Sequence, residues 1–144
     1  MTILVFSDSH GNIYNMCKLI DEFVPDIVIH LGDYARDAEL LKHKHVISVY
    51  GNCDYNRETP KCILLEIEGK RCMLTHGHKY GVKSGLKDLI REATLNGADI
   101  VLYGHTHKQY YAMHGDMVIL NPGAADAQAA YLVIKDDKIE VKLL

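Results

Sequence analysis

The sequence has 144 residues, of which 48% are hydrophobic and 24% are charged, and this composition is typical of a folded protein rather than a disordered chain. The length predicts one domain, residues 1–144, because a chain of this size suits a single hydrophobic core. The formal net charge of −3 argues against the large basic field that non-specific nucleic-acid binding requires, so we expect no long nucleic acid among its partners.

The first residues predict a strand rather than a targeting segment. Thr2 to Phe6 form an apolar run with no basic stretch before it and no small-residue cleavage site after it. No run of about eighteen apolar residues occurs in the sequence. None of the four cysteines forms a CxxC pair, which is typical of reduced thiols. We therefore expect a cytoplasmic protein without membrane spans or disulfides.

The first half of the chain alternates apolar runs with amphipathic stretches. The apolar runs predict strands at residues 3–6, 27–31 and 46–50. The amphipathic stretches predict helices at residues 12–23 and 37–42. This alternating order predicts a parallel sheet.

The helix predicted at residues 12–23 has a clear apolar side. Asn12 is a candidate N-cap, and Pro25 would end the helix. Apolar side chains recur at roughly helical spacing: Tyr14, Cys17, Ile20 and Phe23. We expect this side to pack on the sheet.

The second half of the chain is richer in hairpins. The predicted hairpins pair residues 62–67 with 72–74, 109–113 with 117–120, and 131–134 with 139–143. A helix is predicted at residues 85–96, closed by Gly97, and a strand at 99–103. The apolar side of this helix comprises Leu86, Leu89, Ile90 and Ala93. Parallel crossovers combined with hairpins predict a layered α/β protein with two sheets packed face to face.

Polar clusters directly follow five of the predicted strands. They are Ser7-Asp8-Ser9-His10-Gly11-Asn12, Gly32-Asp33, Gly51-Asn52-Cys53-Asp54, Thr75-His76-Gly77-His78 and Gly104-His105-Thr106-His107. Each combines oxygen or imidazole ligands with glycine, which lets the backbone turn sharply near an ion or a phosphate. Open α/β sheets bind their ligands at strand ends, so the clusters could converge on one edge.

Asp8 and His10 lie two residues apart at the end of a predicted strand. In an extended stretch such side chains point the same way, so both could bind one ion. Alternatively, Asp8 forms a turn before the helix and His10 is a surface residue. His105 and His107 repeat the spacing, and this pair is a better metal signal because neutral imidazole binds metal ions. Alternatively, His105 and His107 are ordinary residues of a polar loop.

Asp33, Asn52 and His76 each follow a different predicted strand. The Asp33 carboxylate could bridge two cations, and the Asn52 amide offers an uncharged oxygen. For each residue alone, an ordinary turn position is an alternative. His76 and His78 alternate, so both could face the same site. Five such clusters are hard to obtain by chance in a short chain, and the joint pattern favours a metal site.

The ordered motifs Asp-x-His, Gly-Asp, Gly-Asn, His and Gly-His-x-His resemble the calcineurin-like metallophosphoesterase superfamily, from Asp8 to Gly123. The short form without a cap domain, with Gly-Asn-Cys-Asp and Asn121-Pro122-Gly123, is similar to the small prokaryotic phosphodiesterases of that superfamily. The resemblance implies an α/β fold that is a four-layer αββα sandwich of two mixed β-sheets flanked by helices.

The resemblance also implies a site for two divalent metal ions. The implied ligands are Asp8, His10 and His107 for the first ion, Asn52, His76 and His105 for the second, and Asp33 as the bridge. Mixed oxygen and nitrogen ligation suits Mn²⁺, our first expectation, and also Ni²⁺, Fe²⁺, Zn²⁺ and Mg²⁺. The implied reaction is in-line attack on a small phosphodiester by a hydroxide held between the ions.

Many superfamily members have a histidine after the ligand asparagine, where this sequence has Cys53. A thiol with a pKa of about 8.5 is a poorer general acid than imidazole near neutral pH, which leaves protonation of the leaving group open. We hypothesise that His78, or water on the second ion, takes this role. Asp54 either orients a ligand or is a turn residue.

Two other functions compete with the phosphodiesterase. One is a phosphomonoesterase that uses the same site. The other is a catalytically weak protein-binding scaffold, like a retromer subunit of this fold, but that relative looks altered at the positions of Asp33 and Asn52, which are intact here. A purely structural zinc site is disfavoured because such sites usually have four Cys or His ligands.

The sequence shows no cap domain, no base-stacking aromatic platform and no extended basic groove, so we expect a small phosphodiester substrate, such as a cyclic or linear nucleotide, rather than a long polymer. Lys79, Lys83 or Arg57 could contact an additional phosphate, although such residues are usually solvated. Tyr110 and Tyr111 either shape a pocket or belong to a dimer interface. A homodimer or higher homo-oligomer therefore stays open.

Overall fold

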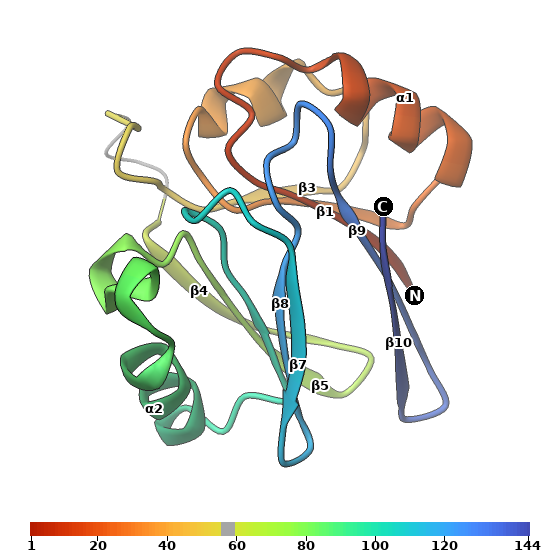
Figure 1. Cartoon of the computed structure of the whole chain (residues 1–144). Helices are drawn as coiled ribbons and strands as arrows, with labels where there is room; N and C mark the ends of the chain where they lie inside the picture. Colours follow the sequence, from red (N-terminus) through yellow and green to blue (C-terminus); the bar gives the residue numbers. More distant parts are fainter. Residues whose placement is uncertain (56–59) are drawn as a thin grey trace.

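Two mixed five-stranded sheets form the centre of the computed structural model, which describes residues 1–55 and 60–144 (Figure 1). The first sheet has the order β10-β9-β1-β2-β3. Its strands are β1 (Thr2–Phe6), β2 (Ile27–His30), β3 (Val46–Ser48), β9 (Ala130–Lys135) and β10 (Lys138–Leu143). β1, β2 and β3 run parallel, as the alternation of strands and helices predicts, and β9 and β10 add antiparallel strands at one side.

The second sheet has the order β4-β5-β6-β8-β7. Its strands are β4 (Cys62–Ile67), β5 (Lys70–Thr75), β6 (Ile100–Leu102), β7 (Tyr110–His114) and β8 (Met117–Asn121). The three central strands are parallel, and the edge strands β4 and β7 pair antiparallel with their neighbours. The three predicted hairpins are therefore confirmed.

The main hydrophobic core lies between the two sheets. Ile3 and Val5 of β1 meet Leu74 of β5 and Leu102 of β6 in this layer, and all four are almost completely buried. Successive strand residues point to opposite faces, so Leu4 and Phe6 point to the outer face of the first sheet. The apolar runs are continuous because both faces of these strands are covered.

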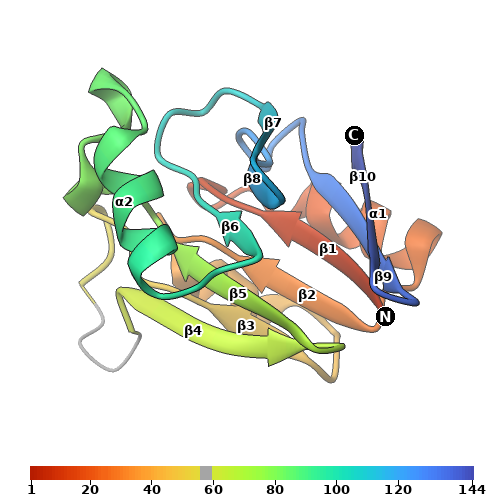
Figure 2. The ribbon, with the colours of Figure 1, turned by 90° about the horizontal axis from the view of Figure 1, so that it is seen from below.

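Two α-helices cover the outer faces. Met16 and Ile20 of α1 (Tyr14–Phe23) pack on Leu4 and Phe6. On the second sheet, Leu89 and Ala93 of α2 (Lys87–Leu95) pack on Met73 and Val101. Figure 2 shows α1 and α2 on opposite sides of the paired sheets. The αββα sandwich is therefore confirmed.

The helix predictions need three corrections. Tyr14 is 78% exposed, because each helical residue turns by about 100° and position 14 lies almost opposite Met16. Residues 35–40 form a 3₁₀ helix, η1 (Ala35–Leu40), in place of the helix predicted at 37–42. Two further short 3₁₀ turns, η2 (His78–Tyr80) and η3 (Val82–Ser84), precede α2 and were not predicted.

The four cysteines, which all lie in the described ranges, carry free thiols. Cys72 is buried, Cys17 is half-buried, and Cys53 and Cys62 are exposed. Within residues 1–55 and 60–144, no helix is both long and apolar enough to cross a membrane.

Candidate metal centre

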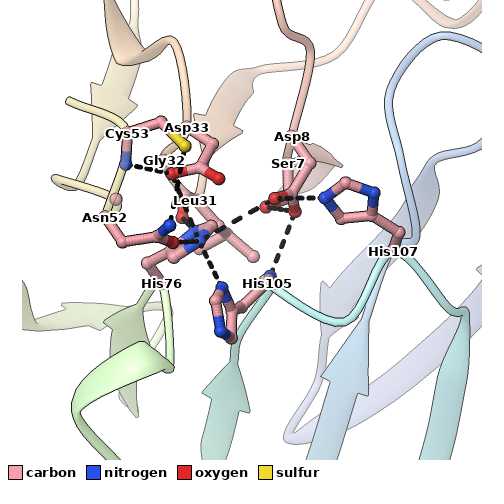
Figure 3. Close-up of polar contacts among 12 residues, drawn as sticks. Ser7, Asp8, Leu31, Gly32, Asp33, Asn52, Cys53, His76, His105 and His107 are labelled. Atoms are coloured by element: carbon pink, nitrogen blue, oxygen red, sulfur yellow. Dashed lines mark hydrogen bonds and ion pairs between the residues drawn. The ribbon is translucent and has the colours of Figure 1, made fainter. Parts of the chain in front are cut away.

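The polar clusters that follow the strands meet at one edge of the sandwich (Figure 3). The first sheet contributes Asp8 after β1, Asp33 after β2 and Asn52 after β3. The second sheet contributes His76 after β5 and the pair His105 and His107 after β6. Parallel strands end at the same edge of a sheet, and two facing sheets therefore bring five loops together.

Two groups of potential ligand atoms share one carboxylate. Asp8, His10, Asp33 and His107 form the first group, and Asp33, His76 and His105 form the second, with the ligand atoms of each group within 4.8 Å of one another. The Asn52 Oδ1 atom lies 3.0 Å from His76 Nε2. The structure thus brings together all seven candidate ligands, divided as the resemblance implies. We call these seven residues the cluster.

The Asp8 carboxylate has one satisfied oxygen and one unsatisfied oxygen. Its Oδ2 atom accepts hydrogen bonds from the Ser7 hydroxyl (2.5 Å) and the His105 backbone N–H (3.0 Å). Among the described residues its buried Oδ1 atom has no hydrogen-bond partner, although His107 Nε2 lies 3.1 Å away. A buried carboxylate oxygen without a partner is costly, and a cation at this point would remove the cost. The donor set therefore fits a metal ion.

Asp33 is held in its ionised form. Burial alone would raise its pKa, but the interaction with His76 and the hydrogen bond from the Cys53 backbone N–H (2.9 Å) outweigh burial and lower the pKa. Its Oδ1 atom lies 3.4 Å from His76 Nε2, and its Oδ2 atom lies 3.8 Å from His10 Nε2. The two oxygens thus face different groups, as a bridging ligand requires.

The tautomer of His76 follows from its partner. Its Nδ1 atom lies 2.7 Å from the Leu31 carbonyl oxygen, which can only accept, so Nδ1 carries a proton. In the neutral ring Nε2 then has a free lone pair, and it points toward Asn52, Asp33 and His105. Burial lowers the pKa of His76, but the nearby Asp33 and Asp8 carboxylates raise it more strongly. A metal ion at Nε2 would therefore compete with a proton.

The loops are bent by residues in the left-handed backbone region. Asp8, His10, Asp33, His105 and His107 all have φ between 48° and 70°. Non-glycine residues seldom adopt such angles, and they concentrate at functional sites. Glycine at position 51 is required for a different reason, since a Cβ atom there would fall on the backbone nitrogen and Oδ1 atom of Asp33.

A buried hydrogen-bond chain supports the loop that carries Asp8 and His10, and we did not predict it. The Gly32 N–H donates to His30 Nδ1 (3.2 Å), so the proton of the neutral ring lies on Nε2 and is donated to Ser9 Oγ (2.8 Å). The Ser9 hydroxyl then donates to Asp37 Oδ2 (2.7 Å), which also accepts the Gly11 N–H (2.8 Å). These side chains fix the loop from behind.

Asp54 and Asn121 hold two other loops. The buried Asp54 carboxylate accepts backbone hydrogen bonds from Asp33 (2.9 Å), Ala35 (2.9 Å) and Gly51 (2.8 Å), so it faces the backbone and not the cluster. Asn121 donates to the Gly104 carbonyl (2.9 Å) and Thr106 Oγ1 (3.0 Å), beside the two cluster histidines. For the role of Asn121, the motif Asn121-Pro122-Gly123 was the only signal in the sequence.

The other two catalytic candidates lie beside the cluster. The His78 ring lies 5.5 Å from the His76 ring and 6.1 Å from the His105 ring, centroid to centroid. Burial, followed by the charge of His76, lowers the pKa of His78. Burial and the charge of Asp33 raise the pKa of Cys53, so the thiol stays neutral while its backbone N–H binds Asp33. Arg57 lies outside the described residues.

The matching family model and the curated relatives agree on one family. A family model described as the calcineurin-like phosphoesterase superfamily domain matches residues 1–135. A probable metallophosphoesterase of Methanothermobacter thermautotrophicus is 34% identical over all of this chain and 92% of its own length. Phosphodiesterase MJ0936 of Methanocaldococcus jannaschii is 30% identical over 85% of this chain and 83% of its own length.

Solved structures agree on the fold. A predicted phosphoesterase from Streptococcus pneumoniae superposes with a TM-score of 0.82 at 29% identity, over 99% of this chain and 88% of the other. The Vps29 protein of Entamoeba histolytica, solved with Zn²⁺, gives a TM-score of 0.79 at 21% identity, over 100% of this chain and 98% of the other. At 21% identity, the match to Vps29 shows only that the fold is shared.

Proposed function

The chain belongs to the calcineurin-like phosphoesterase superfamily, and from this premise we propose that it is a phosphodiesterase that hydrolyses small phosphodiesters with two divalent metal ions. The observation that carries the proposal is the position of Asp33, whose carboxylate is common to both groups of candidate ligands. A shared carboxylate is what a two-metal site needs to keep its ions close.

In this proposal Asp8, His10 and His107 hold one ion, and Asn52, His76 and His105 hold the other. Such ions, when bound, supply Lewis-acid stabilisation of phosphoryl oxygens and a nucleophile at neutral pH. The chain's own part is to fix the ligands before substrate arrives. The Leu31 carbonyl orients His76, and the Ser7 hydroxyl and His105 N–H orient Asp8. Mn²⁺ is our first choice, because the ligands mix oxygen and nitrogen.

The proton of the leaving group is assigned to His78 rather than to Cys53. The ring of His78 lies beside the rings of His76 and His105, which places this imidazole next to the candidate ligands of the second ion. The Cys53 thiol has a raised pKa, which makes it a weak acid at neutral pH.

The test is hydrolysis of bis(p-nitrophenyl) phosphate and of p-nitrophenyl phosphate by metal-stripped protein refilled separately with Mn²⁺, Ni²⁺, Zn²⁺ or Mg²⁺. We expect metal-dependent turnover that favours the diester. Asp33→Asn should lower kcat/KM at least about a hundredfold, because it removes the shared charge.

Asp116→Asn is the matched control, since Asp116 is exposed in the turn between β7 and β8. It makes the same change of charge at the opposite end of β7 and β8 from Asn121, away from the cluster, and should act like the wild type. Preference for the monoester would support a phosphomonoesterase instead. Stoichiometric metal binding without turnover of either ester would support a protein-binding scaffold.

A further inference from the structure

A hollow of about 280 Å³ adjoins the cluster on the side of Asp33. It is lined by Tyr34, Ala35, Arg36, Cys53, Asp54 and Tyr55. The first three residues follow β2 and the last three follow β3, so the hollow lies between the two loops that carry Asp33 and Asn52. Figure 3 shows Cys53 beside Asp33 and away from His107.

The hollow and the cluster share walls. Tyr34 directly follows Asp33, and its ring lies 5.2 Å from the ring of His10, centroid to centroid. Cys53, on the other wall, donates its backbone N–H to Asp33 Oδ1 (2.9 Å). A phosphodiester whose phosphoryl group lies on the cluster would therefore extend one of its two ester groups into the hollow.

The chemistry of the lining favours a flat aromatic group. The Arg36 guanidinium carbon lies 5.2 Å from the centre of the Tyr34 ring, so a planar cation and an aromatic face lie together. Tyr55 is 91% exposed and adds a second aromatic side chain to the lining. Proteins bind unpaired bases by stacking them on aromatic rings and guanidinium planes. The volume is slightly below the usual range of small-molecule pockets, about 300–1,000 Å³, and suits one ring system.

The walls are held in place without a ligand. The Asp54 carboxylate accepts backbone hydrogen bonds from Asp33, Ala35 and Gly51, which ties both loops together. Tyr34 has a left-handed backbone, with φ of 64°, and this conformation turns the chain between Asp33 and Ala35. A preformed subsite binds with less ordering cost than a flexible one.

We propose that this hollow binds the base of a nucleotide ester, which makes nucleotide phosphodiesters the substrate class. The inference rests on the proposed phosphoesterase function of the cluster. Arg36 and Tyr55 are the specificity-determining residues, because they line the hollow and belong to neither group of candidate metal ligands.

The experiment measures adenosine 5′-monophosphate and inorganic phosphate as competitive inhibitors of bis(p-nitrophenyl) phosphate hydrolysis by Mn²⁺-loaded protein. Inorganic phosphate can bind only to the cluster, whereas the nucleotide can bind to the cluster through its phosphate and to the hollow through its base. In the wild type the nucleotide should bind more tightly than phosphate. In Arg36→Ala and in Tyr55→Ala, the ratio of the nucleotide Ki to the phosphate Ki should rise about tenfold, as expected for the loss of one stacking partner.

Two variants serve as controls. Arg91→Ala and Tyr14→Ala remove the same side-chain types from exposed positions on α2 and α1. Both should keep the wild-type ratio. Tyr55 and Arg36 are exposed, so their variants should fold, and equal melting temperatures would verify this.

The outcomes separate the two proposals. An unchanged ratio in both variants, or equal Ki values for nucleotide and phosphate in the wild type, overturns the base subsite and leaves the phosphoesterase intact. A Ki for phosphate that rises as much as that for the nucleotide also overturns it, because Arg36 would then contact phosphate. If Mn²⁺-loaded wild type neither turns over the diester nor binds phosphate, both proposals fail.

Discussion

His78 lies next to the cluster without belonging to either group of candidate ligands. If it protonates the leaving group, His78→Ala should slow the hydrolysis of esters with poor leaving groups about a hundredfold, which is the lower end of the contribution of general acid catalysis. p-Nitrophenolate leaves without a proton, so kcat for the hydrolysis of its esters should change only a few-fold. The measurement is kcat for diesters with leaving groups of increasing pKa.

The exposed His114 provides the control for this series, as His114→Ala removes an imidazole from β7. An equal loss for all leaving groups in His78→Ala would instead mean that His78 binds substrate or supports the neighbouring histidine rings.

His30 carries a prediction about stability and pH. Burial, against the opposing charge of Asp37, lowers its pKa to about 4 from an ordinary value near 6.5. The folded protein thus stays unprotonated at His30 while the unfolded chain takes up a proton, and stability is lost as pH falls from 6.5 toward 4. The loss should be roughly 3 kcal/mol.

The measurement is urea unfolding of metal-free wild type and His30→Gln between pH 7.5 and 4.5. Other histidines are common to both proteins, so their effects cancel in the difference. The stability advantage of the wild type should shrink as pH falls, and a constant difference over this range would show that folding does not lower the pKa of His30.

Sequence patterns predicted the side chains that converge at the strand ends better than the residues that support them. Asp8 and His10 could be identified because their spacing and the preceding strand are local features. The chain from His30 through Ser9 to Asp37 joins positions 21 and 28 residues apart, and only the packed loops bring them together. Asp54 looked like a turn residue or a ligand orienter, and its three backbone partners could not be read from the sequence.

At the scale of elements, the loops after β2 and β3 act as one unit. A Cβ atom at position 51 would overlap Asp33, so Gly51→Ala should push the two loops apart. We expect metal affinity to fall at least about tenfold, as when ligand support is lost, and the free energy of unfolding to fall by about 1–3 kcal/mol. Competition with a chelating dye and urea unfolding measure the two effects.

Gly115→Ala is the comparison for this prediction. Gly115 has φ of 60°, and nothing lies within 4 Å of an added Cβ atom, so the change introduces backbone strain away from the cluster. It should cost about 1 kcal/mol of stability and leave metal affinity unchanged. Equal metal affinity in both variants would mean that the loops adapt independently.

Strand positions were predictable because apolar runs of β-branched residues are buried on both faces, as in β1 and β2. The short 3₁₀ turns were not predictable from the sequence. η1 replaces the predicted helix at 37–42 because its residues follow the tight turn at Asp33 and Tyr34, where the backbone is left-handed. Turns of this kind follow from tertiary contacts that periodicity does not contain.

At the scale of the whole molecule, the layer between the sheets holds the two halves of the cluster together. Leu102 lies in this layer and is 1% exposed. Leu102→Ala should lower the free energy of unfolding by about 2–5 kcal/mol, because it removes buried surface and leaves a cavity. Leu95→Ala, at a position 77% exposed on α2, should cost much less.

Denaturant unfolding of both leucine variants tests this prediction. A cost below about 1 kcal/mol at Leu102 would mean that the sheets close over the cavity. The face-to-face arrangement itself was predictable, since hairpins and parallel crossovers both occur and helices are available for two outer faces. The pairing of β9 with β1 was not, because it joins segments more than 120 residues apart.

The left-handed residues of the cluster have a consequence for the life of the protein in a cell. Each such conformation costs about 1–2 kcal/mol, and five lie in one region of a chain whose total stability is expected to be about 5–15 kcal/mol. Ion binding acts only on the folded chain and offsets this strain. Under metal starvation the folded state would lose this stabilisation, and a larger fraction of the chain would be unfolded and exposed to proteases, so scarcity of the ion would reduce the amount of protein as well as its turnover.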